Sequence, residues 1–307
     1  MKHFWNKFKG PIIILLCSFV WGTTFVAQKF GSDSVGAFTF TGIRFLISGT
    51  VFLIISLLIR MKTHNWKLPP KKAIIISLFI GIVLVIGAGL QQLGINLTKS
   101  PSKSAFITSL YIVFVPILGI FFGRKVKIQV VFAIVIAMVG SFLISTNGDL
   151  VFVIGDILTL VCAVMYAAQI ILIDLIVDDI SSFELCTIQF LVTGFLSSIL
   201  ALITKETITL ELVTKAMPSI LYAALLSGCI GFLFQVVGQK YTEPSVASLL
   251  MSFETIFALL GGFIILHEKL SLIQIIGCSL TFIAIIISQL DIKKLFKKKQ
   301  TIMTTKE

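Results

Sequence analysis

The chain has 307 residues, of which 57% are hydrophobic and only 13% charged, and its mean hydropathy is +1.07. A soluble globular domain is about half apolar and about a quarter charged, so this composition excludes a soluble protein and indicates an integral membrane protein. The net charge of +11 would be compatible with binding to nucleic acid. The basic residues, however, gather in short loops and at the termini, where orientation signals lie, so we expect a lipid bilayer and not nucleic acid as the partner.

A transmembrane helix needs about 20 predominantly apolar residues. Long apolar runs without the alternation of a membrane β-barrel predict an all-α fold, with loops of any length only at 60–72 and 205–217. In chain order the ten predicted spans are 11–30, 35–59, 73–97, 102–122, 126–146, 151–175, 182–204, 218–239, 244–266 and 270–290.

The second half of the chain repeats the first at a shift of about 144 positions. The clearest pairs are Gly87, Gln91, Gly94 and Thr98 with Gly231, Gln235, Gly238 and Thr242. Each half holds five spans, and an odd number gives the halves opposite orientations in the membrane, as in secondary transporters. We therefore predict two inverted five-helix repeats, residues 1–146 and 147–292, followed by a basic cytoplasmic tail, 293–307.

The distribution of charge sets the expected orientation. Of the 25 Lys and Arg residues, 18 fall on one side if the N-terminus is cytoplasmic, six fall on the other side, and Arg44 lies within a span. Basic residues are retained on the cytoplasmic side. We expect a multi-pass protein of the cytoplasmic membrane with both termini inside. The turn at Asp178 and Asp179 lacks a basic residue and does not outweigh this bias.

Small residues and prolines predict how the spans pack. Gly119 and Gly123 form a Gly-x-x-x-Gly pattern that lets helices approach closely. Pro116 is expected to bend the fourth span.

Several stretches resemble the EamA branch of the drug/metabolite transporter superfamily, over nearly the whole chain. These stretches are Trp21-Gly22-Thr23-Thr24-Phe25-Val26-Ala27, Arg44-Phe45, Ala105-Phe106-Ile107-Thr108-Ser109-Leu110-Tyr111, Ser252-Phe253-Glu254-Thr255 and His267-Glu268-Lys269-Leu270. The resemblance implies a ten-span carrier built from two inverted repeats, with both termini cytoplasmic, in a family that includes exporters of amino acids and other metabolites. Thr255 stands where the family commonly has proline, so the residue that would bend the ninth span is absent.

Three charged side chains within or at the ends of spans are candidates for function, because hydrocarbon penalises ionisable groups by several kcal/mol. Glu254 lies near the middle of its span and could carry protons, bind a substrate ammonium or serve as a structural carboxyl. Arg44 could neutralise a substrate carboxylate or tie helices together. Lys103 could line the outer mouth of the pathway or extend into the lipid headgroups.

The neutral candidates for substrate binding are aromatic and amide side chains at mid-depth: Trp21, Gln91, Tyr111, Tyr166, Gln169 and Gln235. Gln91 and Gln235 occupy equivalent places in the two repeats, so both should face the central axis where a carrier binds its substrate. Their alternative role is hydrogen bonding between helices. A binding site lined by aromatic and amide side chains suits small amphipathic organic solutes.

These features together predict a secondary active transporter of small organic metabolites, with amino acids or related solutes as candidates, working as a proton-coupled exporter. A flippase of lipids or lipid-linked sugars with the same fold is the alternative, and a prenyltransferase-like enzyme using Asp174, Asp178 and Asp179 is a remote one. A P-loop, a catalytic triad and a metal-binding motif are absent from the sequence, so we expect no enzyme, cofactor or metal. Oligomeric state stays open.

Overall fold

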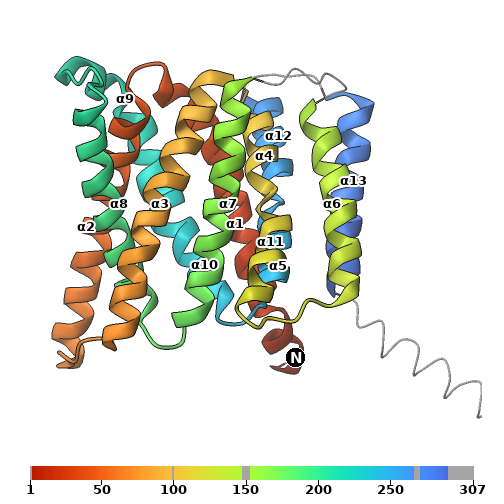
Figure 1. Ribbon diagram of the computed structural model, residues 1–307, viewed down its shortest axis with the longest axis horizontal. Helices are drawn as coiled ribbons and strands as arrows, with labels where there is room; N and C mark the ends of the chain where they lie inside the picture. The colour runs from red at the N-terminus through yellow and green to blue at the C-terminus, as the bar shows by residue number, and fades with distance from the viewer. Residues whose placement is uncertain (1, 99, 147–152, 266–269, 290–307) are drawn as a thin grey trace, which may run out of the picture.

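The structure, a computed structural model, describes residues 2–98, 100–146, 153–265 and 270–289, and in this part the chain is helical apart from short turns (Figure 1). The helices are α1 Lys2–Ser32, α2 Ala37–Thr63, α3 Lys71–Thr98, α4 Pro101–Ser109, α5 Tyr111–Phe121, α6 Ile128–Thr146, α7 Ile154–Ile176, α8 Ser182–Ile203, α9 Leu210–Tyr222, the π-helix η1 Ala223–Gly231, α10 Phe232–Gln239, α11 Pro244–Met251, α12 Glu254–Ile265 and α13 Leu272–Gln289. The basic tail 293–307 and the motif residues His267, Glu268 and Lys269 lie outside the described residues.

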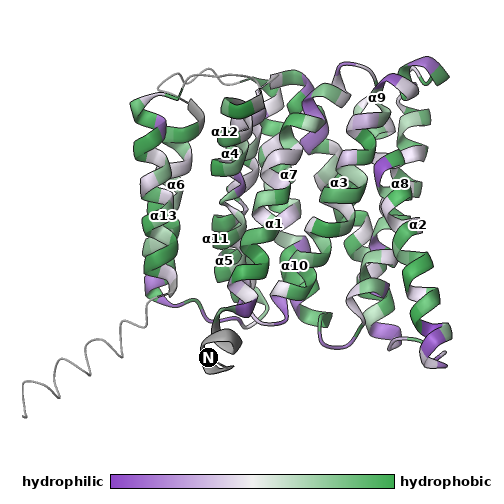
Figure 2. Cartoon of the chain, turned by 180° about the vertical axis from the view of Figure 1, so that it is seen from behind, coloured by the Kyte–Doolittle hydropathy of each residue, from purple (hydrophilic) through white to green (hydrophobic). Residues whose placement is uncertain are grey.

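The helices have the length and composition of membrane spans. Within the described residues, eight helical stretches are long and apolar enough to cross a bilayer, and two shorter apolar helices, Ile128–Ile144 and Leu272–Ser288, accompany them. Figure 2 shows hydrophobic residues along the bodies of the helices and hydrophilic residues mainly at the turns above and below. The predicted all-α membrane fold with ten spans is confirmed.

The two halves of the chain are interleaved. α2 packs along α8, α3 along α7 and α6 along α13, and each pair joins one helix of the first half to one of the second. The partners run in opposite directions (Figure 1), as inverted repeats require. The core is therefore built largely from contacts between repeats.

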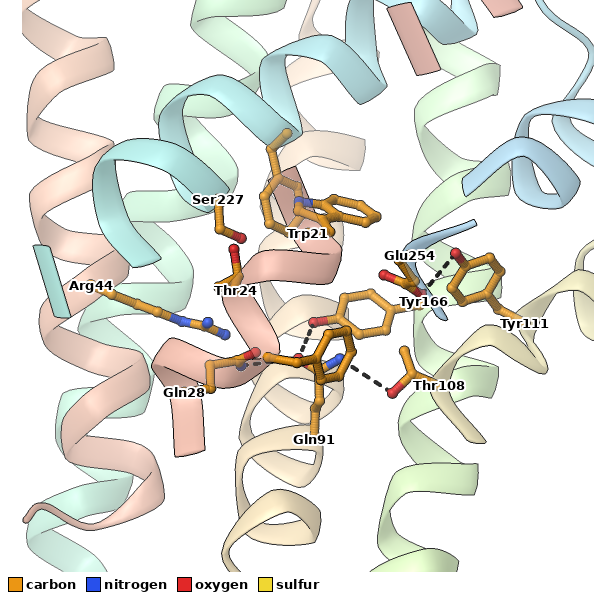
Figure 3. Close-up of a pocket in the computed structure, with 12 residues that line it drawn as sticks. Trp21, Thr24, Gln28, Arg44, Gln91, Thr108, Tyr111, Tyr166, Ser227 and Glu254 are labelled. Atoms are coloured by element: carbon orange, nitrogen blue, oxygen red, sulfur yellow. Dashed lines mark hydrogen bonds between the residues drawn. The ribbon is translucent and has the colours of Figure 1, made fainter. Parts of the chain in front are cut away.

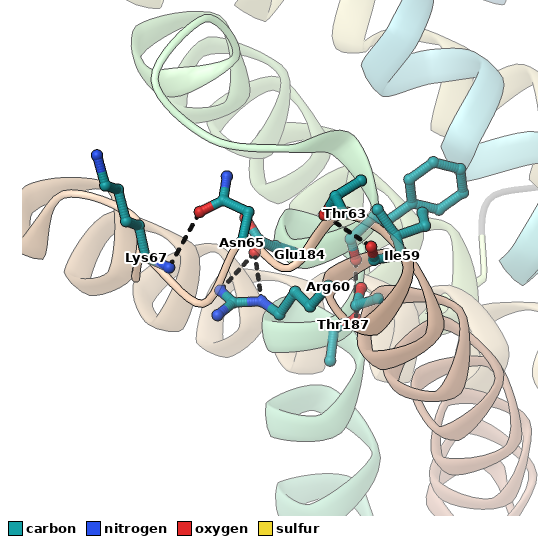
Figure 4. Close-up of polar contacts among 9 residues, drawn as sticks. Ile59, Arg60, Thr63, Asn65, Lys67, Glu184 and Thr187 are labelled. Atoms are coloured by element: carbon teal, nitrogen blue, oxygen red, sulfur yellow. Dashed lines mark hydrogen bonds and ion pairs between the residues drawn. The ribbon is translucent and has the colours of Figure 1, made fainter.

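Polar contacts tie both ends of the α2–α8 pair. At the lower end Nε and Nη2 of Arg60 donate to Oε1 of Glu184 at 3.0 and 2.6 Å (Figure 4). At the upper end the Glu206 carboxylate accepts from the backbone N–H groups of Phe38 and Thr39 at 3.0 and 2.7 Å. This carboxylate satisfies donors that the first turn of α2 leaves unpaired and complements the positive end of the helix dipole.

The fourth and ninth spans are each interrupted near their middle. α4 ends at Ser109 and α5 begins at Tyr111, while α11 ends at Met251 and α12 begins at Glu254. At each interruption a serine hydroxyl donates to the carbonyl three residues earlier, Ser109 to Phe106 at 2.7 Å and Ser252 to Leu249 at 2.7 Å. Such bonds compete with the regular helical ladder.

The fourth span is interrupted at Leu110, and Pro116, which is expected to bend this span, sits inside α5. Two expectations about span details are corrected by the structure. Gly123 has φ of +75° with open space around its missing side chain, so it ends α5 as a left-handed cap and is not a packing contact. The predicted loop 205–217 is helical from Leu210 onward, because the Thr209 hydroxyl caps α9 by accepting from Leu212 N at 3.3 Å.

Candidate functional site

A cavity lies at mid-depth between the two halves, beside both interrupted spans (Figure 3). Its free volume is about 30 Å³, enough for no more than a few water molecules. Its lining residues come from both repeats: Trp21, Thr24, Phe25, Gln28, Arg44, Gln91, Thr108, Tyr111, Tyr166, Ser227, Phe232 and Glu254. An inverted-repeat carrier is expected to bind its substrate at this depth.

Glu254 is the acidic side chain among these lining residues. It is the first residue of α12, directly after the interruption of the ninth span, and only 2% of its surface is exposed. The Tyr111 hydroxyl donates to Glu254 Oε1 at 3.0 Å (Figure 3). Because Tyr111 follows the interruption of the fourth span, this bond joins the two interrupted spans to each other.

Arg44 is the basic side chain of the cavity, and it lies across the cavity from Glu254 (Figure 3). Its guanidinium stacks near the rings of Phe45 and Phe40, with centroids at 4.7 and 5.5 Å. Only 4% of Arg44 is exposed, and its Nε has no hydrogen-bond partner within the described residues. A buried guanidinium N–H without an acceptor is costly and can be satisfied by an anionic group of a bound solute.

Gln91 is the centre of a network of amide side chains that borders the cavity. Its Oε1 accepts from the Tyr166 hydroxyl and from Gln28 Nε2, both at 3.3 Å, and its Nε2 donates to Thr108 Oγ1 at 3.3 Å. Gln28 also donates to Gln92 Oε1 at 3.2 Å. These bonds fix the polar side chains that face the cavity.

Trp21 forms the aromatic wall. Its indole packs edge-on against Phe232, with ring centroids 4.9 Å apart, and its Nε1 has no hydrogen-bond partner in the described part of the chain. A side chain at Gly231 would meet the indole, since an added Cβ would lie 2.6 Å from Nε1. The absence of a side chain at position 231 therefore places the ring.

The structure brings Trp21, Gln91, Tyr111 and Tyr166 together at the cavity, but it places two predicted partners elsewhere. Gln169 and Gln235 hydrogen-bond each other reciprocally, at 3.4 and 3.0 Å, and neither lines the cavity. Their amides satisfy each other between α7 and α10 and have no need of a polar cavity.

Lys103 is likewise not among the residues that line the cavity. Its Nζ lies 2.6 Å from Oδ2 of Asp156, whose side chain is fully buried. The lysine therefore joins the start of α4 to the start of α7 and does not simply extend into the headgroups.

Six lining residues were not predicted from the sequence: Thr24, Phe25, Gln28, Thr108, Ser227 and Phe232. A signal for some of them was present. Trp21, Thr24, Phe25 and Gln28 follow the spacing i, i+3, i+4, i+7 that places residues on one face of a helix. Thr108 stands three residues before Tyr111 on the same span.

Comparison with known proteins identifies the family. A family model described as the EamA-like transporter family matches the chain twice, over residues 8–146 and 153–290. The chain belongs to the EamA-like transporter family. The resemblance seen in its motifs is thereby confirmed, and the protein is a multi-pass membrane transporter of this family.

Two relatives of this EamA protein are described as transporters. An uncharacterized transporter of Archaeoglobus fulgidus is 30% identical over 279 residues, which are 91% of this chain and 85% of the relative. The uncharacterized transporter YoaV of Bacillus subtilis is 24% identical over 273 residues, covering 87% and 92% of the two chains. A protein crystal structure superposes with a TM-score of 0.77 at 15% identity, covering 94% of this chain and 98% of the other, and it supports the fold alone.

Proposed function

We propose that this EamA-family protein is a proton-coupled exporter that carries small organic solutes through the cavity between its repeats, with Glu254 as the coupling carboxylate. The observation that carries the proposal is the placement of buried Glu254 and buried Arg44 on opposite sides of one cavity (Figure 3). Ionisable groups at membrane depth are costly and are retained where they bind substrates or ions. The small-solute class follows from the family and from the aromatic and amide walls.

The preferred solute is a zwitterion such as an amino acid or a related amphipathic molecule. Its carboxylate would accept hydrogen bonds from Arg44, whose planar guanidinium suits a carboxylate, and its ammonium would lie near Glu254. Trp21, Tyr111 and Tyr166 would contact its apolar part, with Gln91 fixing orientation.

Outward transport is supported by a second hollow at the end of the bundle that carries the N-terminus. This hollow has a volume of about 580 Å³ and is lined by the turn at 123–127, by Asp174 and Asp178, and by residues 239–245. Lys127 Nζ lies 3.0 Å from Glu243 Oε1 here, and Arg124 pairs with Asp174. A wide polar vestibule on the cytoplasmic side would admit solutes from inside the cell.

The orientation with both termini in the cytoplasm remains part of the proposal, as does the cytoplasmic membrane as location. The turns at 64–70, 122–127 and 240–243 lie at the same end as the N-terminus (Figure 1), and these turns hold basic residues. We also propose that the repeats are residues 1–146 and 147–292, with 293–307 as a tail. The two separate family matches support this division.

The orientation is tested with a C-terminal reporter. A phosphatase that is active only outside the cytoplasm, fused after Leu290, should stay inactive, while a cytoplasmic fluorescent reporter at the same position should work. Fusions within the segment 205–209, which we place outside, supply the matched positive control. Strong phosphatase activity from the Leu290 fusion contradicts the orientation.

The function is tested in two steps with purified protein. A thermal-shift screen against amino acids, nucleosides, sugars and amines identifies solutes that raise the melting temperature, because a ligand of the folded state stabilises it. Each hit is then followed in proteoliposomes with and without an imposed pH gradient. Gradient-driven accumulation is expected for the wild type.

The Glu254→Gln variant separates coupling from structure. Its amide keeps the shape of the side chain and can still accept from Tyr111, so it should remain folded, lose gradient-driven accumulation and retain exchange without a gradient. The control is Glu211→Gln, which removes an exposed carboxylate in the first turn of α9, away from both hollows, and should leave accumulation intact. Transport by Glu254→Gln with the pH dependence of the wild type contradicts the coupling role.

A further inference from the structure

The two interrupted spans end their regular helices in the same way. In each, a serine hydroxyl donates to the carbonyl three residues earlier, one residue intervenes, and the next residue begins a new helix. Tyr111 is that residue in the first repeat and Glu254 in the second, at a shift of 143 positions. They are structural counterparts, and one carries the donor and the other the acceptor.

We infer that Tyr111 is the positioning residue for Glu254, and that their hydrogen bond is a link between the repeats whose strength depends on the protonation of Glu254. The inference rests on the proposed coupling role of Glu254. The geometry consists of a 3.0 Å bond between side chains that are 1% and 2% exposed, both facing the cavity and both directly following an interruption.

The physical basis is the difference between charged and neutral acceptors. A hydroxyl that donates to a carboxylate forms a bond about twice as strong as one to a neutral carboxyl, and low surrounding polarity enlarges the difference. Ionised Glu254 therefore holds the two interrupted spans together at mid-depth. Protonated Glu254 holds them more weakly.

The interruptions allow this local change to move larger elements. The turns there are closed by bonds to the third residue back, as Leu110 N to Ile107 O at 3.2 Å and Phe253 N to Leu250 O at 3.3 Å. Short stretches of this kind inside a helix often mark hinges. Weakening the link would free the spans to bend at these points and open the cavity.

Several other ionisable groups surround Glu254. The titratable groups facing it from neighbouring helices are Cys17 on α1, Tyr111 on α5, and Cys162 and Tyr166 on α7. Arg44 of α2 lies across the cavity. Of the other helices against α12, α6 has no ionisable residue and α4 has only Lys103, which pairs with Asp156. Tyr111 is the neighbour that donates a hydrogen bond to the carboxyl.

The experiment measures how readily the cavity opens, without any substrate. Ser227 lines the cavity and is 7% exposed, so a Ser227→Cys thiol reports opening through its reaction with a charged methanethiosulfonate. The parent protein carries this change together with Cys229→Ala and Cys278→Ala, which remove the partly exposed native thiols, and with Cys17→Ala and Cys162→Ala, which remove the thiols that face Glu254. The rate of thiol labelling is measured in nanodiscs from mildly acidic to mildly alkaline pH. Each rate is divided by the labelling rate of the unfolded protein at the same pH, which corrects for ionisation of the thiol itself.

The parent should label about fivefold faster when Glu254 is protonated, which is the expected effect of weakening one charge-assisted bond. Glu254→Gln keeps a hydrogen bond from Tyr111 to a neutral acceptor, so it should label at the fast rate of the protonated parent at every pH. Tyr111→Phe removes the bond and should also abolish the pH dependence. The matched control is Tyr222→Phe. It removes another tyrosine hydrogen bond between the repeats, to Thr23 Oγ1 at 2.9 Å, and should keep the pH dependence.

The outcomes separate the two proposals. A pH-independent rate in Glu254→Gln together with a pH-dependent rate in Tyr111→Phe overturns the positioning role and leaves the coupling role standing. A pH-dependent rate in Glu254→Gln overturns the coupling role. A parent rate that does not change with pH overturns the proton-dependent link.

A second variant covers the case in which Tyr111→Phe does not fold. Fluorotyrosine at position 111 keeps the ring and the hydroxyl but is a stronger donor. A stronger bond to the ionised carboxylate favours the ionised form, so the midpoint of the pH profile should move to lower pH. An unchanged midpoint overturns the inference.

Discussion

At the level of single residues, the two charged side chains of the cavity have unequal surroundings. Glu254 has a hydrogen-bond donor in Tyr111, whereas the Arg44 guanidinium rests on phenylalanine rings and its Nε is unsatisfied among the described residues. Stacking on an aromatic ring stabilises a cation by about 0.5–2 kcal/mol, which does not replace a lost hydrogen bond to a charged group. Of these two charged side chains, Arg44 is therefore the one that a bound ligand would stabilise more.

Replacing Arg44 is predicted to weaken binding of carboxylate-containing solutes. Hydrogen bonds to charged groups contribute about 1.5–3 kcal/mol, so Arg44→Gln should raise the dissociation constant about 10- to 100-fold. Arg44→Lys should lie between, because it keeps the charge and loses the planar fork. Calorimetric titration of a hit from the thermal-shift screen provides the measurement.

The control for this prediction is Arg60→Gln. Arg60 pairs with Glu184 at the lower end of α2, outside the cavity (Figure 4), so its loss should leave the affinity unchanged. Equal affinity of Arg44→Gln and wild type would show that Arg44 serves the packing of α2 alone.

At the level of elements, the eighth span departs from the symmetry of the repeats. Its middle, Ala223–Gly231, is a π-helix, whereas the matching part of α3 is regular α-helix. Such segments are rare and often occur at functional sites. Here the π-helix supplies Ser227 to the cavity wall and ends at Gly231, which faces the Trp21 indole.

Gly231→Ala is predicted to displace Trp21 and to lower ligand affinity. The new Cβ would lie 2.6 and 2.8 Å from two atoms of the indole, and an overpacked contact costs about 1–3 kcal/mol. Gly261→Ala is the matched control, since a Cβ there would meet Val26 at an ordinary 3.5 Å. We expect a change in Trp21 fluorescence and weaker binding for Gly231→Ala only, and identical behaviour of the two variants contradicts the packing argument.

At the level of the whole molecule, stability depends on contacts between the repeats. The pairs α2–α8, α3–α7 and α6–α13 each cross from one half to the other. Glycines permit close approach in the first pair, where a Cβ at Gly49 or Gly194 would meet backbone nitrogens of the opposite helix at 3.0 and 2.6 Å. In a bilayer such packing replaces the hydrophobic effect as the force that holds helices together.

Neither half is therefore predicted to be stable alone. Residues 1–146 and 147–307, expressed separately, should be degraded, whereas their co-expression should restore a folded complex that purifies through a tag on one half. The measurements are the membrane level of each half and the melting temperature of the complex. A first half that accumulates alone with a cooperative melting transition contradicts the interleaved fold.

The sequence alone determined the membrane class, the ten spans and the inverted repeat, because apolar length and periodic identity are local or additive properties of the chain. It also singled out Trp21, Arg44, Tyr111 and Glu254, since polar groups in apolar stretches stand out wherever the chain folds. Residues such as Gln28 could have been added from helical spacing.

Only the tertiary structure decided which of these side chains meet. Gln91 and Gln235 match in the sequence, yet one faces the cavity and the other pairs with Gln169, because the packing of neighbouring helices sets the direction of a side chain. Lys103 pairs with the buried carboxylate of Asp156, 53 positions away in the chain. The ninth span is interrupted without a proline. Each of these contacts depends on residues that are distant in the chain. The pattern within one segment carries no information about which distant residues will pack against it.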